Sequence, residues 1–356
     1  MSNIEKVDKN FGCGTKIEKD NIRFYDALCE PFKIYGIFYE GGKWRRVPEA
    51  VAKTVSEGVY ALHANTAGGR VRFKTDSPYI AISAKMPSMG RMPHFTLCGA
   101  AGFDLYLNGA NQGVFRPPFD ASGGYEAIRE GYEYTAEYGA LGEVRNVEIN
   151  FPLYSDVSEL YIGVAEDSLM LPPDPYKIEC PVVYYGSSIT QGGCASRPGT
   201  SYQAFLSREL DLNYINLGFS GNAKGEDEIA NYIKTLDMSA FVYDYDFNAP
   251  SYEHLEATHE RMFNIIREAN PTLPIIIMSK PKPVLDSLNL KRLELIKKTY
   301  ENAKASGDEN VYFIDGRELM EFAGKEGTVD TTHPTDLGFF SMAKRLSPVL
   351  KQILFK

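Results

Sequence analysis

Hydrophobic and polar residues alternate along the first half of the chain, in short runs separated by turn residues. The runs span residues 58–64, 70–75, 79–86, 103–107, 147–153 and 159–165. Alternation of this kind is typical of strands with one buried face. Asn108-Gly109 directly follows one run and is a strong signal for a two-residue hairpin. Helical patterns are scarce here, apart from one near residues 48–56, so the first half predicts a sandwich of two antiparallel sheets.

The second half follows a different pattern, which begins after the proline-rich stretch 171–175. Apolar runs occur at 182–185, 214–217, 241–245, 274–278 and 311–314, and helical patterns at 202–210, 226–236, 253–269, 290–305 and 336–354. Continuous apolar strands that alternate with helices predict a parallel sheet covered on both faces. We therefore predict a β-sandwich domain, residues 1–175, followed by an α/β domain, residues 176–356. Ligands of such sheets bind at the carboxyl ends of the strands, where functional side chains are expected.

Composition narrows the range of partners. Hydrophobic residues make up 44% of the 356 positions and charged residues 24%, the mix of an ordinary globular protein. The net charge of −9 argues against a nucleic-acid partner, because such partners need a basic face. The short basic runs at 43–46 and 297–298 are expected to be solvated surface.

The cysteines and the N-terminus bear on the compartment. Cys13, Cys29, Cys98, Cys180 and Cys194 are odd in number and form no CxxC pair, which favours a reducing cytoplasm. Residues 1–10 lack the apolar core of a signal peptide, and no run approaches the roughly 18 apolar residues of a membrane span. We expect a cytoplasmic protein without a membrane partner, unless a signal peptide has been removed, and a homo-oligomer is compatible with the sequence.

Ser188 stands in the segment Tyr185-Gly-Ser-Ser-Ile-Thr-Gln-Gly192, directly after the first apolar run of the second half. A serine on a tight turn at the mouth of a parallel sheet exposes its hydroxyl, and the backbone N–H groups around it can face an anion. Glycine and serine are also ordinary turn residues, so the alternative is a turn without a catalytic role.

Asp330 and His333 stand three residues apart, just before the last helical pattern. This spacing places both side chains on one side of a turn, where the carboxylate accepts a hydrogen bond from one imidazole nitrogen and leaves the other for a serine. The alternative is simple N-capping of the last helix by the residues around Pro334.

Two further segments follow the second and third apolar runs. Gly221 in Asn216-Leu-Gly-Phe-Ser-Gly-Asn222 can bring a backbone N–H close to a substrate oxygen, and Asn248 in Asp244-Tyr-Asp-Phe-Asn-Ala249 can add an amide N–H. Taken singly, each is equally well explained by a glycine turn or an Asx turn.

The combination is more specific than its parts. A serine, a glycine, an asparagine and a D-x-x-H pair occur in the order of the four blocks of the SGNH hydrolase family (GDSL type), which this half of the chain resembles. Gly102-Phe-Asp-Leu-Tyr106 resembles the G-x-D-L-Y signature of a β-sandwich domain that precedes some SGNH esterases. The resemblance implies a doubly wound, flavodoxin-like α/β hydrolase domain after the sandwich. Two departures are Ser187, where the family has an acidic residue, and D-x-x-x-N in place of G-x-N-D around Asn248.

Carried onto this chain, the resemblance makes Ser188 the nucleophile, His333 its base and Asp330 the residue that orients the base. The N–H groups of Ser188 and Gly221 and the Asn248 amide then form the oxyanion hole. The implied activity is hydrolysis of short-chain esters, acetyl above all, on a carbohydrate or another small molecule. An acyltransferase that passes the acyl group to a hydroxyl acceptor through the same triad stays open, as does an inert binding module.

No cofactor or metal is expected. His254 and His259 are five residues apart on a predicted helix, whereas a metal pair on one helix face is four apart. Gln191-Gly192-Gly193 lacks the lysine and Ser/Thr of a phosphate-binding loop. His63 and His94 are expected to pack or hydrogen-bond within the first half.

Overall fold

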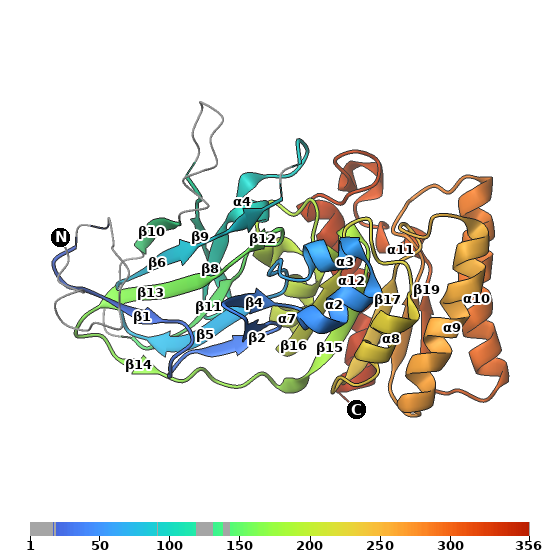
Figure 1. The fold of residues 1–356 in the computed structure, drawn as a ribbon, viewed down its shortest axis with the longest axis horizontal. Helices are drawn as coiled ribbons and strands as arrows, with labels where there is room; N and C mark the ends of the chain where they lie inside the picture. Colours follow the sequence, from blue (N-terminus) through green and yellow to red (C-terminus); the bar gives the residue numbers. More distant parts are fainter. Residues whose placement is uncertain (1–16, 18, 91, 119–130, 138–142, 356) are drawn as a thin grey trace. The chain divides into compact units, whose positions relative to one another are not determined.

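A computed structural model of the chain describes residues 17, 19–90, 92–118, 131–137 and 143–355. Cys13 and residues 1–10, on which part of the localisation argument depends, lie outside the described residues. The chain divides into two compact units (Figure 1). Unit 1 holds the residues up to Arg45, Ala64–Pro175 and Arg197–Gly199, and unit 2 holds Arg46–His63, Tyr176–Ser196 and the residues from Thr200 onward.

The described part of unit 1 contains two larger antiparallel sheets, besides two short two-stranded pairs. The first has the order β1 (Ile22–Asp26), β13 (Glu159–Ala165), β6 (Tyr79–Lys85), β10 (Tyr132–Glu137). The second has the order β14 (Met170–Leu171), β5 (Arg70–Thr75), β11 (Arg145–Asn150), β8 (Phe103–Leu107), β9 (Ala110–Phe115), with β2 (Lys33–Tyr35) also paired to β5. Short elements complete the unit: β3 (Phe38–Glu40) paired with β4 (Lys43–Arg45), β7 (Ser88–Met89) paired with β12 (Ser155–Asp156), and α4 (Leu97–Ala101).

The period-two pattern explains how these sheets share a core. Alternate residues of β5, β6 and β13, such as Phe73, Ile82 and Ile162, join one cluster of fully buried side chains. Residues of opposite parity, such as Ala81, belong to a smaller cluster with Phe24. The predicted hairpin is confirmed, because Asn108 and Gly109 connect β8 to β9 with φ of 48° and 79°, as a type I′ turn requires.

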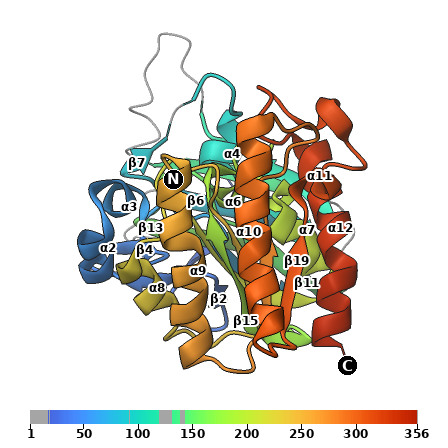
Figure 2. The same ribbon diagram turned by 90° about the vertical axis from the view of Figure 1, so that its right-hand side faces the viewer.

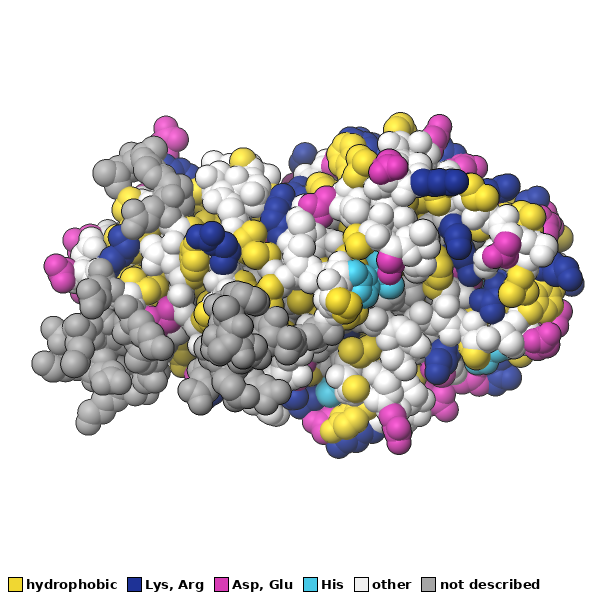
Figure 3. Space-filling model, turned by 90° about the horizontal axis from the view of Figure 1, so that it is seen from above, with side chains coloured by type: hydrophobic (Ala, Val, Ile, Leu, Met, Phe, Trp, Pro, Cys, Tyr) yellow, Lys and Arg dark blue, Asp and Glu magenta, His cyan; other side chains and the backbone are white. Residues whose placement is uncertain are grey.

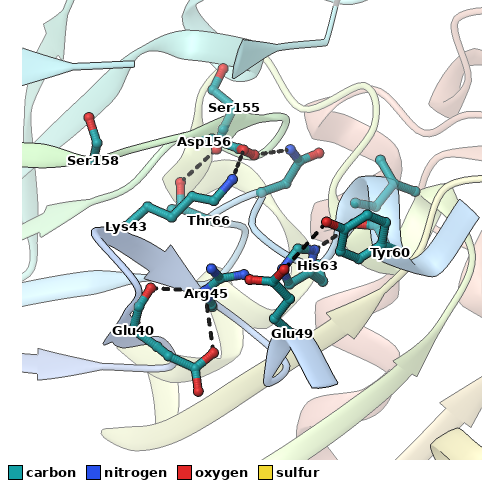
Figure 4. Close-up of polar contacts among 12 residues, drawn as sticks. Glu40, Lys43, Arg45, Glu49, Tyr60, His63, Thr66, Ser155, Asp156 and Ser158 are labelled. Carbon is teal, nitrogen blue, oxygen red and sulfur yellow. Dashed lines mark hydrogen bonds and ion pairs between the residues drawn. The ribbon is translucent and has the colours of Figure 1, made fainter. Parts of the chain in front are cut away.

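Polar contacts link the short strands of unit 1. Lys43 on β4 forms an ion pair with Asp156 on β12 at 3.2 Å, and Arg45 donates to the backbone oxygen of Glu40 across the β3–β4 pair (Figure 4). Asn65 donates a further bond to Asp156 at 2.9 Å. Arg45 is only 3% exposed, so the expectation of solvated surface for residues 43–46 is wrong at this residue.

Unit 2 is built on a five-stranded sheet in which every pairing is parallel. Its order is β16 (Leu212–Gly218), β15 (Ile178–Gly186), β17 (Ala240–Asp244), β18 (Ile275–Met278), β19 (Val311–Ile314). This is the 2-1-3-4-5 order of a flavodoxin-like sheet, so the predicted architecture is confirmed. The order reverses beside β15, and the carboxyl ends of β15, β16 and β17 therefore lie at the switch point.

Helices cover both faces of this sheet. One face carries α8 (Asp227–Ile233), α9 (Tyr252–Ala269) and α10 (Ser287–Ala305), and Figure 2 shows α9 and α10 side by side. The other face carries α7 (Tyr202–Leu210) and α12 (Asp336–Leu354), where Tyr202 stacks on Phe339 and meets Tyr184 edge-on. Two short helices, α6 (Ser188–Gln191) and α11 (Gly316–Leu319), follow β15 and β19. Two single 3₁₀ turns lie at Pro198–Thr200 and Gly324–Gly327.

Residues 46–63 of the first half fold with unit 2. The helical pattern at 48–56 is confirmed by α2 (Glu49–Val55), whereas the predicted strand at 58–64 is wrong, because most of these residues lie in α3 (Glu57–Leu62). The Ser56 hydroxyl caps α3 by accepting from the Val59 N–H. Val47, Ala52 and Val59 are fully buried in the core that α8 and α9 form with the sheet. A division of the chain at residue 175 therefore leaves this segment outside the unit with which it packs.

The surface carries charges of both signs. On the face shown in Figure 3, Lys and Arg are interspersed with Asp and Glu, and histidine side chains reach the surface. Lys297 and Lys298 are exposed, as expected for this run. Among the described residues, no helix is long and apolar enough to cross a bilayer.

The packing of α3 generates a prediction about stability. Val59→Ala removes two buried methyl groups and should lower the free energy of unfolding by about 2 kcal/mol, at ~0.8 kcal/mol per carbon plus a cavity cost. Urea titration measures the change, with Lys53→Ala on the exposed side of α2 as control. Equal, small effects of both substitutions would contradict the placement of α3 in this core.

Candidate active site

The turn that carries the predicted nucleophile, Ser188, begins where β15 ends. Ser187 is fully buried and caps α6, its hydroxyl accepting from the Ile189 N–H at 3.2 Å. Ser188 opens α6, is 9% exposed, and places its Oγ 2.9 Å from His333 Nε2. Two consecutive serines therefore differ in role: one closes the helix end, and the other points its hydroxyl at an imidazole.

Close packing around the turn requires glycine at the end of β16. A Cβ on Gly218 would lie 2.1 Å from the backbone nitrogen of Gln191 in α6. Gln191 is fully buried, and its side-chain oxygen accepts from the Ser220 N–H at 2.9 Å. The turn that carries Ser188 and the loop after β16 are thus held against each other by backbone contact and by one buried side chain.

The Asp330–His333 turn lies just before α12. Asp330 Oδ1 accepts from the backbone N–H groups of Thr332 at 3.1 Å and His333 at 2.7 Å. Asp330 Oδ2 lies 2.8 Å from His333 Nδ1. A carboxylate at Nδ1 holds the proton on that nitrogen, which leaves Nε2 as the acceptor facing Ser188. Thr335 also caps α12, so the turn both starts a helix and orients an imidazole.

Electrostatics favour an ionised Asp330. Partial burial alone would raise the pKa of this carboxyl, but the hydrogen bonds from the His333 backbone and ring lower it to about 2. The nearby Cys194 behaves in the opposite way, since burial and the Asp330 charge raise the pKa of its thiol to about 12. Near neutral pH the Cys194 thiol therefore stays protonated.

Gly221 and Asn248 lie on neighbouring loops of unit 2. Gly221 is exposed, has φ of 69° and closes a turn in which the Asn222 N–H bonds to the Phe219 oxygen at 2.9 Å. A Cβ at Gly221 would meet open space, so close packing does not require glycine here. The positive φ does, because residues with a side chain rarely adopt it. Asn248 is half-buried, and its Nδ2 donates to the same Phe219 oxygen at 3.0 Å. An amide nitrogen has two hydrogens, so one N–H serves this bond and one is left for another acceptor.

Arg46 supports the loop that carries Gly221. The sequence placed it in solvated surface, but the side chain is only 2% exposed, so that expectation is wrong. Its guanidinium donates to the backbone oxygens of Asn216 and Gly218 and stacks over the Phe219 ring at 4.8 Å. It also donates to the backbone oxygen of Leu62 at 2.8 Å. Because the two carbonyls at the end of β16 lie 170 and 172 residues away, no local sequence signal could have revealed this role.

The remaining histidines of unit 2 serve packing and hydrogen bonding. His259 is 2% exposed, stacks on Tyr243 and Tyr245, and bonds Thr299 at 2.8 Å. Burial lowers the pKa of His259 to about 3, so it stays neutral. His63 stacks on Tyr60 within the same unit. His94 lies in unit 1.

A cavity of about 590 Å³ lies elsewhere in unit 2. It is lined by the ends of α9 and α10 and by the turn at residues 306–310, at the amino ends of β18 and β19. None of the predicted site residues lines it. Since ligands of such sheets bind at the carboxyl ends, its size does not make it the candidate site.

Comparison with known proteins places this site in a family. The model of the GDSL-like lipase/acylhydrolase family matches residues 179–351, and the model of the GxDLY N-terminal domain of SGNH-hydrolase-type esterases matches residues 22–170. A solved structure from Bacteroides ovatus ATCC 8483, described as a GDSL-like lipase, is 31% identical, with a TM-score of 0.82 over 94% of this chain and 98% of that one. The chain belongs to the GDSL-like lipase/acylhydrolase family. It is an SGNH/GDSL-type esterase with a GxDLY domain before the hydrolase domain, as the resemblance implied.

Two further structures share the fold. A salicylyl-acyltransferase, SsfX3, from a tetracycline biosynthetic pathway is 20% identical, with a TM-score of 0.76 over 94% of this chain and 98% of that one. An acetyl xylan esterase, Est2A, from the rumen bacterium Butyrivibrio proteoclasticus is 15% identical, with a TM-score of 0.60 over 94% and 99%. No curated protein matches the chain.

The buried imidazole of His259 generates a prediction about pH. An unfolded histidine has a pKa near 6.5, whereas in the folded state it is about 3, so unfolding takes up a proton between these values. This contribution to stability is complete above pH 6.5 and is lost as the pH falls toward 3. His259→Gln should therefore reduce the slope of unfolding free energy against pH in this window by up to ~1.4 kcal/mol per unit. Urea titrations from pH 4 to 7 measure it, and parallel slopes would contradict a neutral buried His259.

Proposed function

We propose that this esterase hydrolyses short-chain, chiefly acetyl, esters of carbohydrates through a Ser188–His333–Asp330 triad. The observation that carries the proposal is the continuous hydrogen-bond chain from Ser188 Oγ to His333 Nε2 and from His333 Nδ1 to Asp330, at 2.9 and 2.8 Å. Ser188 is 9% exposed and the His333 side chain 21%, so solvent reaches the reacting atoms.

The proposed mechanism has two acyl-transfer steps. His333 Nε2 takes the Ser188 proton as Oγ attacks the ester carbonyl, and the carbonyl oxygen becomes an oxyanion. His333 then gives the proton to the leaving alcohol oxygen as the ester C–O bond breaks. In the second step His333 takes a proton from water, which attacks the acyl-enzyme carbonyl. The bond between the acyl carbon and Ser188 Oγ then breaks, His333 returns the proton to Oγ, and the acid leaves. Asp330 stays ionised throughout and stabilises the imidazolium.

The oxyanion would be held by three donors. They are the backbone N–H groups of Ser188 and Gly221 and the second amide N–H of Asn248. Support comes from the fixed loops on which they lie: the Gly221 turn is closed by the Asn222–Phe219 bond, and the Asn248 amide shares that same Phe219 acceptor. A preorganised donor of this kind is worth roughly 10²–10³ in rate.

The adjacent serines offer a matched test of the nucleophile. Ser188→Ala should lower kcat by at least ~10³-fold without loss of stability, since its hydroxyl serves the imidazole. Ser187→Ala should cost about 1 kcal/mol as a lost helix cap, but leave kcat within a few-fold. Ester hydrolysis and urea titration of both variants measure the two effects. Equal losses of activity, or an active Ser188→Ala, would show that another residue is the nucleophile.

Two assays test which acyl group the enzyme prefers and whether water or a sugar hydroxyl accepts it. With p-nitrophenyl esters, kcat/KM should be highest for acetyl and fall steeply beyond butyryl, because no segment of the sequence supplies an acyl-chain tunnel. With an acetylated sugar, free acetate should form at the same rate whether or not a second sugar is added as acceptor. Rates that rise toward octanoyl would contradict the short-chain proposal, and acyl transfer to the added sugar would favour the acyltransferase alternative.

A further inference from the structure

Arg292 reaches from α10 to the loop that carries Asn248. It is 7% exposed, and its two terminal nitrogens donate to the backbone oxygens of Asp246 at 2.8 Å and Ala249 at 3.0 Å. These two carbonyls flank Asn248 in the chain. One rigid guanidinium therefore spans the segment in which the proposed oxyanion donor lies.

The other contacts of this loop do not bridge the two sides of Asn248 as Arg292 does. The Asn248 N–H bonds to the Tyr245 oxygen at 2.9 Å, which closes a local turn. The Lys280 N–H, after β18, bonds to Asp246 Oδ2 at 3.3 Å. The first bond is internal to the loop and the second holds only its beginning. The Lys280 ammonium also lies over the Phe247 ring at 4.6 Å, and the Asn248 Nδ2 bond to the Phe219 oxygen ties the side-chain amide but not the backbone on either side of it. Arg292 is the described side chain that fixes both sides of Asn248 from another element.

The contacts of Arg292 fix the spacing of two backbone carbonyls. A buried guanidinium is costly to desolvate, its two hydrogen-bond acceptors here are uncharged carbonyls, and its Nε has no hydrogen-bond partner among the described residues. Its charge also acts on the Asp246 carboxyl, whose pKa is raised by burial and lowered by the charges of Lys280 and Arg292. A planar fork can donate to two carbonyls at a fixed spacing, whereas an ammonium group acts as a single point charge. Lysine at this position would keep the charge but lose the span.

We propose that Arg292 is a positioning residue for the oxyanion hole, which it serves by fixing the loop Asp246–Ala249 so that the free Asn248 N–H faces the carbonyl oxygen of the substrate. This inference rests on the proposed role of Asn248. Loss of the span lets the amide move, and a displacement of about 1 Å in a positioning group can cost ~10²-fold in rate.

Arg267 provides a matched control. It lies at the end of α9 and donates to the backbone oxygens of Asn270 at 2.9 Å and Leu273 at 2.6 Å, besides an ion pair with Asp308. These contacts lie before β18 and β19, at the amino ends of the strands and therefore at the opposite end of the sheet from the candidate site. Arg267→Lys therefore removes a similar carbonyl span in the same unit without touching the Asn248 loop.

The experiment compares Arg292→Lys, Arg267→Lys, Asn248→Ala and the double variant Arg292→Lys/Asn248→Ala. Rates are expressed per active site, counted by phosphonate labelling of Ser188, so that loss of folded protein does not count as loss of kcat. Arg292→Lys should lower kcat 10- to 100-fold with KM within about threefold, and Arg267→Lys should leave kcat within twofold. Asn248→Ala should lower kcat about 10²-fold, and the double variant should be no slower than Asn248→Ala alone.

The outcomes separate the two proposals. Equal kcat losses in Arg292→Lys and Arg267→Lys, or a double variant in which the losses multiply, would overturn a positioning role for Arg292. A wild-type kcat in Asn248→Ala would instead remove Asn248 from the oxyanion hole, and the Arg292 proposal with it. If Arg292→Lys does not fold, Arg292→Gln replaces it, because a neutral amide buries no charge, and the same comparisons decide.

Discussion

The hydrogen bond between Ser188 and His333 joins two turns that are 145 residues apart in the chain, and the candidate site depends on it. The parallel sheet makes this meeting possible. Because all five strands run in one direction, every loop at their carboxyl ends lies at one edge, and the turn after β15 can face the turn before α12. The rest of unit 2 keeps these turns in place, through Gly218 against α6, Gln191 against Ser220, and buried arginines on the loop carbonyls.

Local features of the sequence predicted much of this arrangement. Period-two alternation predicted β5, β8 and β13, and the Asn108-Gly109 hairpin was readable because its turn type needs two residues that tolerate positive φ. The Asp330–His333 spacing also predicted a local geometry, since three residues suffice to close one turn. What failed depended on distant partners. Residues 58–64 alternate like a strand but form α3, whose buried face is set by the core of unit 2.

The buried arginines show the same limit at the level of single residues. Arg46 stands in a basic run that reads as surface, yet its partners are the carbonyls at the end of β16. Arg292 carries no signal in α10 beyond a polar residue in a helix, and only the fold reveals that it spans the Asn248 loop. Backbone carbonyls have no residue identity, so side chains that recognise them leave no pairing pattern in the sequence.

Covalent capture tests most directly whether Ser188 is the nucleophile of this esterase. The protein, incubated with an aryl phosphonate, should gain the mass of one phosphonyl group, lose its esterase activity in proportion, and yield the modified residue in the peptide that contains Ser188. An active enzyme that resists the phosphonate, or an adduct on another residue with full loss of activity, would contradict the account.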